Sequence, residues 1–282
     1  MNVYLNEFSV FIFDLDGCVY RNFSLYPGAK ELINGLLNDD KKIYFLTNNS
    51  RDTSETIRKK LNEMGLNTDK IPIITMTEMI GKYLYEKNGA SKILSVGSEE
   101  LSAALQKEGH QLLTFDSKEI CDFVVVGRDT EFTYERLYKS TRFLTGKTKL
   151  VLVNPDFNHP GLEGENVPET GAIAAAIQAA AEITEISFVG KPNCYAYKRI
   201  LNEADVDVNQ CVMIGDNPLT DIQGGASANM KTIWISHSKK FPQNLGIQPD
   251  ITVHSMQELY EMYIANYFYY VEGVNKKGRV IP

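Results

Sequence analysis

Short runs of apolar residues alternate along this chain with longer segments whose apolar residues recur every three or four positions. After the apolar run 9–13, for example, the spacing predicts a helix with one buried face, made of Ala29, Leu32, Ile33, Leu36 and Leu37. Alternation of short strands with helices is typical of an α/β fold with a parallel sheet. The predicted strands are 9–13, 42–46, 92–96, 123–126, 150–153, 186–189, 212–214 and 231–235.

The middle of the chain repeats this alternation by itself, with helices predicted near 99–108 and 133–145 and an alanine-rich helix over 172–181. Thr170 precedes that last helix and is its predicted N-cap. The strands from 186 onward then resume the first pattern. We therefore predict a discontinuous core domain made of residues 1–78 and 185–260, with a smaller α/β domain, residues 79–184, inserted into it.

The end of the chain, residues 261–282, is predicted to be a helical extension followed by a tail. Six aromatic residues occur within the eleven positions 260–270, and the apolar residues from 256 to 271 follow a helical pattern. One interpretation is that this helix covers an outer face of the sheet. The alternative is a homodimer contact, because tyrosine and phenylalanine are enriched at interface cores. The aromatic residues are Tyr260, Tyr263, Tyr267, Phe268, Tyr269 and Tyr270.

Composition narrows the function classes. The 282 residues are 23% charged and 43% hydrophobic, as in ordinary globular proteins. A net charge of −7 disfavours a nucleic-acid surface, which needs clustered lysine and arginine. No apolar run approaches the roughly 20 residues of a membrane helix, and no signal peptide is visible. Four cysteines without a CxxC pair fit reduced thiols, so we expect a cytoplasmic protein with neither a nucleic acid nor a membrane as partner.

Polar residues of similar chemistry follow four of the predicted strands. In open α/β sheets, ligands bind outside the carboxyl ends of the strands, so these residues can converge on one point. Carboxylates are suitable ligands for Mg²⁺, and lysine supplies a positive charge for a phosphoryl group. The four sets are Asp14 with Asp16, Thr47 with Asn48, Gly190-Lys191-Pro192, and Gly215-Asp216-Asn217 with Asp221.

Each of these motifs by itself is most often a turn or a helix cap. Their occurrence in order, each directly after an apolar strand, favours a common site instead. The segments FDLDGCVY, FLTNNS, VGKP and MIGDNPLTDI resemble the four motifs of the haloacid dehalogenase (HAD) superfamily. YPGA, VVVGRDTEFTYERL, LVNPD, TGAI and PDITVHSMQEL are further similar to its subfamily IIA, the NagD-type and 4-nitrophenylphosphatase-like phosphatases.

This resemblance covers about residues 8–260 and implies a Rossmann-like core with an inserted cap domain. Only 31 residues separate Asp16 from Thr47, which one helix and one strand consume, whereas 144 residues separate Thr47 from Lys191. The lid must therefore lie between the second and third motifs, which in the family's terms is a type C2 cap.

By resemblance, the chain is a Mg²⁺-dependent phosphomonoesterase acting on a small phosphorylated metabolite. Asp14 would be the nucleophile that forms an aspartyl-phosphate, and Asp16 the general acid and then the base. The resemblance further implies two sets of ligands, for the metal and for the phosphoryl group. The metal ligands would be Asp14, the Asp16 carbonyl and Asp216, and the phosphoryl ligands Thr47, the Asn48 amide and Lys191.

Other residues receive supporting or specificity roles. Asp221 would orient Lys191 or metal-bound water, with Asn49 and Asn217 as weaker candidates. His159 and Glu169, the latter standing where the subfamily usually has glycine, are candidate specificity residues. The simpler interpretation of His159 is a solvent-exposed turn residue, and that of Glu169 is a carboxylate pointing outward. Cys18 stands where the family often has threonine, which would place a thiol near the metal.

Three alternatives remain open. A response-regulator-type signalling domain also uses acidic residues, threonine and lysine, but it has about 120 residues and does not explain Asp16 or the long insert. A non-catalytic phosphate-binding or scaffold protein would retain the site without activity. A phosphotransferase or phosphomutase of the same superfamily would pass the phosphoryl group to an acceptor other than water.

Overall fold

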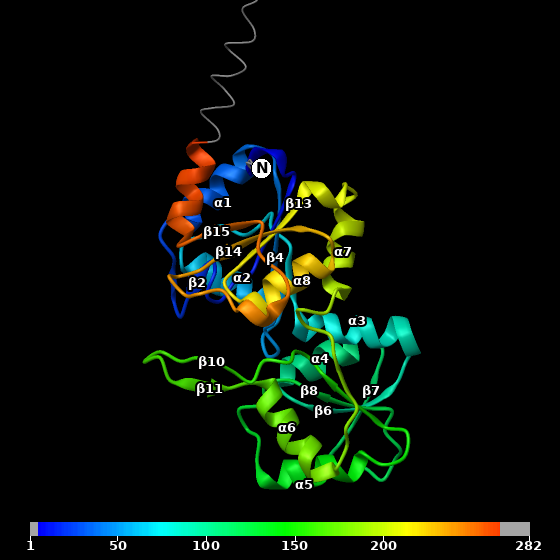
Figure 1. Cartoon of the computed structure of the whole chain (residues 1–282). Helices are drawn as coiled ribbons and strands as arrows, with labels where there is room; N and C mark the ends of the chain where they lie inside the picture. Colours follow the sequence, from blue (N-terminus) through cyan, green and yellow to red (C-terminus); the bar gives the residue numbers. More distant parts are fainter. Residues whose placement is uncertain (1–4, 266–282) are drawn as a thin grey trace, which may run out of the picture. The chain divides into compact units, whose positions relative to one another are not determined.

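The computed structural model describes residues 5–265, which form two compact units (Figure 1). Unit 1 contains the described residues up to Leu46, Glu63–Pro72 and the described residues from Tyr197 onward. Unit 2 contains Thr47–Asn62 and Ile73–Ala196. Each unit has its own parallel sheet with helices packed on it, as the alternating sequence pattern predicts.

The larger sheet has the strand order β15-β14-β13-β1-β4-β5. Neighbours from β15 to β4 pair in parallel, and β1 lies between β13 and β4, with Phe13 opposite both Ile214 and Phe45. All residues of β1 and β13 are buried, as expected for parallel strands covered on both faces. The strands are β1 (Val10–Phe13), β4 (Lys42–Thr47), β5 (Ile73–Thr75), β13 (Cys211–Gly215), β14 (Lys231–Ile235) and β15 (Ile251–Val253).

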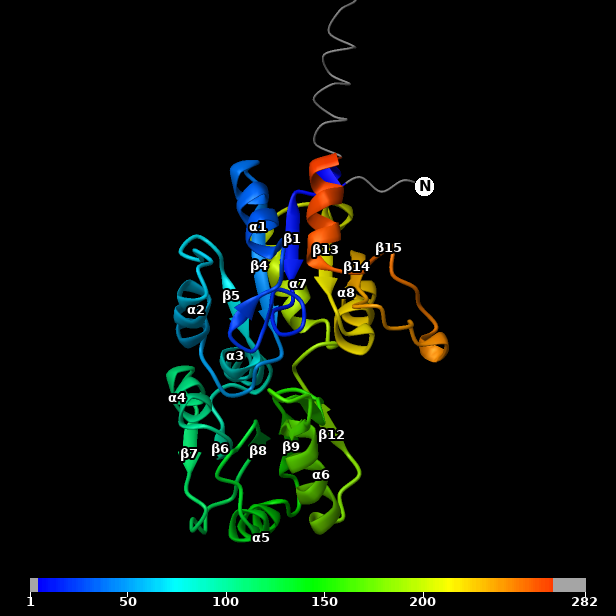
Figure 2. The ribbon, with the colours of Figure 1, turned by 90° about the vertical axis from the view of Figure 1, so that its left-hand side faces the viewer.

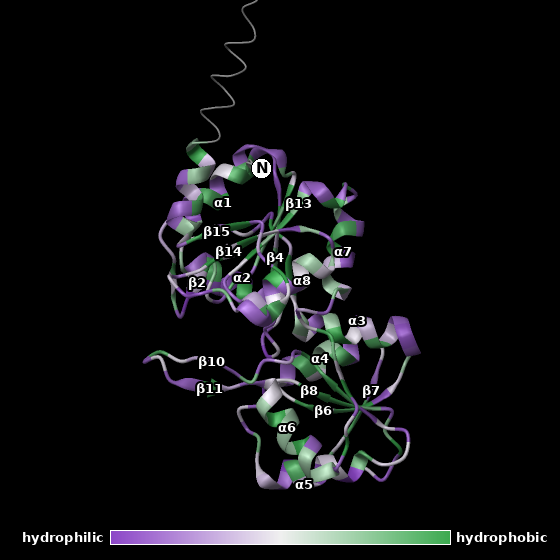
Figure 3. Ribbon diagram, viewed as in Figure 1, coloured by the Kyte–Doolittle hydropathy of each residue, from purple (hydrophilic) through white to green (hydrophobic). Residues whose placement is uncertain are grey.

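Helices cover both faces of the unit 1 sheet. Helix α1 (Ala29–Asn38) and the helix over residues 256–265 lie on one face, and α7 (Tyr195–Ala204) and α8 (Gln223–Ser227) lie on the other (Figure 2). Colouring by hydropathy shows the apolar strands enclosed between more polar helices (Figure 3). The buried core therefore lies along the strands.

The helix over residues 256–265 packs on α1. Met256 and Leu259 are fully buried, and the Tyr263 hydroxyl donates a hydrogen bond to Asp39. A side chain at Gly35 would meet the Tyr263 ring, so the two helices touch closely. This packing agrees with the covering interpretation of the aromatic segment. The described residues do not include Tyr267, Phe268, Tyr269, Tyr270 or the rest of the tail. The predictions for those positions therefore stay predictions.

Unit 2 contains a five-stranded parallel sheet of order β12-β9-β8-β6-β7. Helices α3 and α4 pack against each other, as do α5 and α6, and Figure 1 shows these two pairs on opposite faces. The elements are α3 (Met76–Asn88), β6 (Lys92–Val96), α4 (Glu99–Lys107), β7 (Gln111–Leu113), β8 (Phe123–Val126), α5 (Tyr134–Phe143), β9 (Lys149–Leu152), α6 (Thr170–Ala181) and β12 (Ile186–Phe188).

Two small antiparallel hairpins complete the fold. One follows β1 in unit 1, and the other connects β9 to α6 in unit 2. The hairpins are β2 (Tyr20–Arg21) with β3 (Ser24–Leu25), and β10 (Asn158–Pro160) with β11 (Asn166–Pro168). The remaining short elements are η1 (Leu5–Glu7), α2 (Ser54–Glu63), η2 (Val208–Gln210), the π-helical turn η3 (Pro218–Ile222) and η4 (Gln243–Leu245).

Two predictions about elements were wrong. The strand near 186–189 does not resume the first sheet, because β12 pairs with β9 in the sheet of unit 2. Thr170 is not an N-cap: it is the first residue of α6, and the Glu169 carboxylate caps the helix by accepting a bond from the Thr170 amide. The Thr170 hydroxyl instead donates to Ser50 Oγ at 2.9 Å, a contact that only the folded chain creates.

Among residues 5–265, no helix is both long enough and apolar enough to cross a membrane.

Candidate active site

Asp14 follows β1 directly and lies at the carboxyl end of the unit 1 sheet. Its amide donates to the Ile214 carbonyl at 2.9 Å, which continues the pairing of β1 with β13, and the residue is only 7% exposed. Asp16 is exposed to solvent. Between them and the first hairpin, Gly17 turns the chain with φ +92° and donates to the Tyr20 carbonyl at 2.8 Å. The loop therefore holds one aspartate inside the fold and presents the other outward.

Asp216 and Asp221 come from the loop and the π-helical turn that follow β13. The Asp216 carbonyl accepts a bond from the Trp234 indole at 2.9 Å, and the Asn217 side chain caps η3 through the Leu219 amide. Asp221 is 1% exposed and accepts a bond from the Asn217 amide at 3.0 Å. The main chain must pass so close to this carboxylate that a Cβ at Gly215 would lie 2.2 Å from Asp221 Oδ2.

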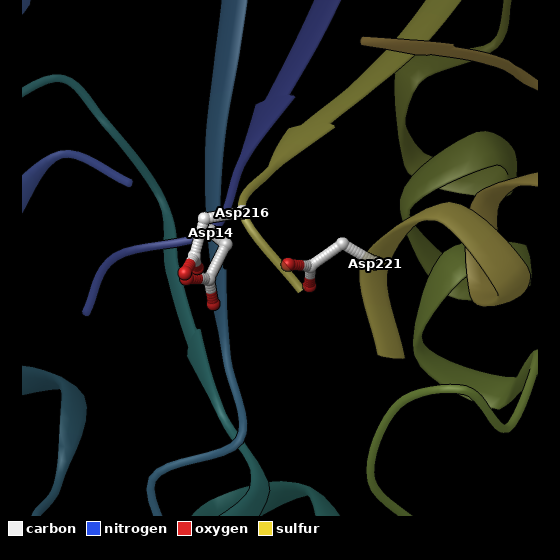
Figure 4. A group of neighbouring side chains, drawn as sticks. All are labelled: Asp14, Asp216 and Asp221. Carbon is white, nitrogen blue, oxygen red and sulfur yellow. The ribbon is translucent and has the colours of Figure 1, made fainter. Parts of the chain in front are cut away.

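The carboxylates of Asp14, Asp216 and Asp221 form one cluster. One oxygen from each lies within 4.8 Å of the others, and Figure 4 shows Asp14 and Asp216 side by side with Asp221 reaching toward them. Three carboxylates this close repel one another, and two of them, Asp14 and Asp221, are buried. Lys239 Nζ lies 3.9 Å from Asp216 Oδ2 and offsets part of this negative charge. Oxygen ligands on rigid elements are the donor set that Mg²⁺ prefers. The cluster therefore fits a divalent cation.

Thr47, the last residue of β4, and Asn49 form hydrogen bonds within the loop that precedes α2. Thr47 is 5% exposed, and its hydroxyl accepts a bond from the Asn49 amide at 3.2 Å. The Asn49 side-chain oxygen accepts bonds from the amides of Arg51 and Asp52. Asn49 is thus engaged in a local turn, of the kind that asparagine commonly forms.

Asn48 joins three segments of unit 2. Its side-chain oxygen accepts a bond from the Lys191 amide at 2.8 Å, and its nitrogen donates to the Lys191 carbonyl at 3.2 Å and to Asp156 Oδ2 at 2.9 Å. The Asn48 carbonyl accepts a bond from the Asn154 side chain at 2.6 Å. Lys191 is only 2% exposed. We call Asn48, Asn154, Asp156 and Lys191 the asparagine clamp.

His159 and Glu169 meet at the base of the β10–β11 hairpin. His159 Nδ1 lies 2.8 Å from Glu169 Oε1, and Arg128 Nη1 lies 3.5 Å from the same oxygen. Burial raises the pKa of the Glu169 carboxyl, while the positive charges of Arg128 and His159 oppose this shift. The Arg128 amide also donates to Ser50 Oγ at 3.1 Å, which ties this cluster to the loop after β4.

The structure thus collects the predicted residues in two groups. In unit 1 they are Asp14, Asp16, Asp216, Asn217 and Asp221, and in unit 2 they are Thr47, Asn48, Asn49, His159, Glu169 and Lys191. Lys191 belongs to the second group because β12, the strand before it, belongs to the sheet of unit 2. Cys18 is fully buried, with Sγ 3.7 Å from the Ile214 carbonyl.

Sequence reasoning missed the parts that Asp156, Arg128 and His237 play. Asp156 lies in the segment LVNPD and Arg128 in VVVGRDTEFTYERL. Both segments resemble the subfamily, but the sequence assigns no role to either residue. His237 donates to the Gly17 carbonyl at 2.7 Å, across 220 positions of sequence. No local sequence pattern predicts a contact over that separation.

Comparison with known proteins gives consistent relatives. The profile of the haloacid dehalogenase-like hydrolase family matches residues 11–111, and a second HAD-hydrolase-like profile matches residues 188–259. An acid sugar phosphatase of Staphylococcus saprophyticus is 27% identical over 90% of this chain and 98% of its own.

Solved structures agree with these matches. A 4-nitrophenylphosphatase from Thermotoga maritima superposes with a TM-score of 0.82 at 30% identity, covering 92% of this chain and 98% of its own. A hypothetical protein from Pyrococcus horikoshii has a TM-score of 0.80 at 32% identity, covering 89% of this chain and 98% of its own.

Proposed function

Because the chain belongs to the haloacid dehalogenase superfamily, among its NagD-type and 4-nitrophenylphosphatase-like phosphatases, we propose that it hydrolyses a small phosphate monoester with Mg²⁺ through an aspartyl-phosphate on Asp14. The observation that carries this proposal is the carboxylate cluster of Asp14, Asp216 and Asp221 at the end of two adjacent parallel strands. The family match supports the reaction, and the cluster supports its location.

Asp14 attacks phosphorus and displaces the alcohol in this proposal. Its main chain is fixed by β1 and β13, so the carboxylate needs little reorganisation before attack. Asp16 protonates the departing oxygen and then removes a proton from the attacking water, which its exposed position permits. Both aspartates regain their starting state when phosphate leaves.

The ligands of the metal in this proposal are the Asp14 carboxylate, the Asp16 carbonyl and the Asp216 carboxylate, with Asp221 and Asn217 in support. A bound Mg²⁺ would neutralise the repulsion between the Asp14 carboxylate and the phosphate dianion. The Asn217 cap holds the turn η3, which carries Asp221.

The phosphoryl oxygens are bound by Thr47, Asn48 and Lys191. Since the side-chain amide of Asn48 serves the asparagine clamp, its main-chain amide is the group assigned to phosphate. Lys191 contributes the positive charge. Asn49 supports this loop through its turn with Arg51 and Asp52.

Substrate choice is assigned to the inserted domain, predicted as residues 79–184, with 1–78 and 185–260 as the predicted core. Because β12 pairs with β9, the sheet of that inserted domain also includes Ile186–Phe188. His159 and Glu169, held together with Arg128, are the proposed specificity residues. The relatives named for sugar phosphates and for 4-nitrophenyl phosphate make small esters of these classes the first substrates to test. Four free cysteines support a reducing, cytoplasmic setting.

The test is a phosphate-release assay with 4-nitrophenyl phosphate and a panel of sugar phosphates. The wild-type protein is expected to release phosphate and alcohol in equal amounts, which separates hydrolysis from transfer to another acceptor. Asp14→Asn is expected to lose all turnover while keeping its circular dichroism spectrum and melting temperature. Near-normal activity in that variant would exclude Asp14 as the nucleophile.

The metal assignment has its own test. Chelation is expected to stop turnover, Mg²⁺ to restore it, and Ca²⁺ to inhibit, because Ca²⁺ takes more ligands at longer distances and can bind both oxygens of Asp14. Titration calorimetry with Mg²⁺ is expected to show binding that Asp216→Asn weakens. Full activity in chelator contradicts the assignment.

A further inference from the structure

We propose that His237 is a positioning residue that fixes the loop carrying Asp14 and Asp16, acting through the carbonyl of Gly17. His237 lies two residues after β14, far along the chain from that loop, and belongs to none of the motifs assigned to the reaction. The inference rests on the proposed function, since it assigns a role toward the catalytic aspartates.

The contact itself is specific. His237 Nε2 lies 2.7 Å from the Gly17 oxygen. A carbonyl oxygen can only accept, so Nε2 must carry the hydrogen and donate it. The bond closes the far end of the loop, whose near end is fixed by the bond from the Asp14 amide to Ile214. Asp16 therefore lies on a turn that is anchored on both sides.

Gly17 lies between two acidic residues of the proposed site, Asp16 and Asp216. Its φ of +92° suits glycine, and a Cβ there would lie 2.6 Å from Asp216 Oδ1. The Gly17 main chain thus leaves no room for a side chain beside the Asp216 carboxylate, and it directly follows Asp16. Movement of the Gly17 carbonyl would therefore shift the turn that carries Asp16 next to Asp216.

The imidazole of His237 is held in place by a ring on its face. Tyr26 stacks on it with centroids 4.8 Å apart and planes 29° apart, and the Tyr26 amide donates to the Val19 carbonyl at 3.0 Å. Burial raises the pKa of the Tyr26 hydroxyl, and the Asp216 and Asp16 carboxylates add to the shift against the opposing charge of Arg21. Tyr26 begins the YPGA segment, which the proposed reaction does not use.

The main chain at His237 adopts a left-handed conformation that is unfavourable for residues other than glycine. His237 and Ser238 have φ of +44° and +63°, in the left-handed region that glycine takes more readily. The His237 amide donates to the His254 carbonyl at 3.2 Å, and the Lys239 amide to the Ser236 carbonyl at 2.8 Å. These bonds hold the strained turn so that the ring reaches Gly17. Strain maintained beside a catalytic loop is common at functional sites.

A positioning role predicts a dependence on the leaving group. Asp16 must protonate a poor leaving group such as an alkoxide, whereas 4-nitrophenolate departs with little help. If His237 aligns the loop that carries Asp16, replacing His237 will slow the hydrolysis of alkyl esters more than that of the aryl ester. Substrate binding depends on other residues and should change little.

The experiment compares kcat and KM for glycerol 1-phosphate and 4-nitrophenyl phosphate in wild type, His237→Gly, His237→Phe and His237→Gln. Glycine suits the left-handed backbone, phenylalanine keeps the stacked ring without the donor, and glutamine keeps a donor of similar reach. We expect His237→Gly and His237→Phe to lower kcat about 10-fold to 100-fold on glycerol 1-phosphate and about 3-fold or less on the aryl ester. His237→Gln is expected to recover part of the loss, with KM within about 2-fold throughout.

Ser238→Gly is the matched control, because it relieves the neighbouring left-handed residue and leaves the ring in place. It should match wild type on both substrates, and the melting temperature of His237→Gly should not fall. Equal losses on both substrates, an unchanged alkyl rate in His237→Gly, or no difference between His237→Gln and His237→Phe would overturn the positioning role. A wild-type protein that hydrolyses neither ester would refute the proposed function itself, and with it this role.

Discussion

Gly17 and Gly89 both have positive φ, +92° and +72°, but their surroundings differ. A side chain at Gly17 would collide with the Asp216 carboxylate, whereas nothing lies within 4 Å of a Cβ at Gly89. Alanine costs about 1–3 kcal/mol of backbone strain at either position. We expect Gly17→Ala to lose phosphatase activity by about 100-fold or more and Gly89→Ala to keep it, with the larger fall in melting temperature in Gly17→Ala because of the added collision. Equal activities would show that the contact with Asp216 is unimportant.

The four cysteines differ in reactivity for reasons visible at the residue scale. Burial, with a smaller contribution from Asp207, raises the pKa of Cys211 to about 11, and burial also raises the pKa of Cys121. At pH 8 only about one Cys211 in a thousand would carry the reactive thiolate. Cys18 is fully buried and Cys194 is partly exposed.

We therefore expect one thiol, Cys194, to react rapidly with Ellman's reagent in the native protein at pH 8, and Cys194→Ser to abolish that phase. All four should react in denaturant. Because of its raised pKa, the Cys211 thiol forms a thiolate only at high pH. Its modification should therefore accelerate only as the pH rises toward about 11. Rapid labelling of Cys18 would contradict the burial that separates it from solvent.

At the scale of elements, the packing of the helix over residues 256–265 on α1 depends on Tyr263. Its ring contacts Gly35 and its hydroxyl bonds to Asp39, with only 7% of the residue exposed. We expect Tyr263→Ala to lower the free energy of unfolding by about 3 kcal/mol, since large-to-small core changes cost 2–5, and Tyr263→Phe by about 1 kcal/mol. Urea denaturation measures both values. A larger loss in the phenylalanine variant than in the alanine variant would argue that packing contributes little.

Elements were predictable where the pattern is local. The strands over 92–96 and 123–126 match β6 and β8 because each is an apolar run ended by polar or turn residues. The partner of β12 was not predictable, since Ile186–Phe188 could extend either sheet on periodicity alone. Its pairing with β9 depends on how the chain returns from α6, which is a property of the fold.

At the scale of the whole molecule, the site also contains residues whose proximity could be predicted from the sequence and contacts that could not. Asp14, Asp216 and Asp221 were predictable because parallel strands end at one edge, which brings distant residues together by topology. The bond from Asn48 to Asp156 spans 108 positions and joins two loops, so no periodicity contains it. Side-chain contacts between loops are decided by packing after the strands are in place.

Substrate preference is the property we expect to belong to unit 2. We predict that His159→Ala and Glu169→Gln change the relative rates among sugar phosphates by about 10-fold, because the first removes the ring that faces Glu169 and the second removes the carboxylate that faces Arg128. The rate with 4-nitrophenyl phosphate should change less. A panel of kcat/KM values tests this, with Glu163→Gln, in the exposed connection between β10 and β11, as a control. Uniform changes across the panel would contradict the specificity role.

The β10–β11 hairpin extends from unit 2 with few buried residues (Figure 1). Phe157, just before the hairpin, is 62% exposed and Leu162, in its connection, is 70% exposed. Nothing lies within 4 Å of a Cβ added at Gly164. A protease needs an accessible stretch that can be drawn out into its cleft, and these residues offer one. Brief chymotrypsin treatment should therefore cut the chain first between 157 and 163, and a short epitope inserted at Gly164 should be displayed without disturbing expression. The hairpin is thus a practical handle for labelling or immobilising the protein.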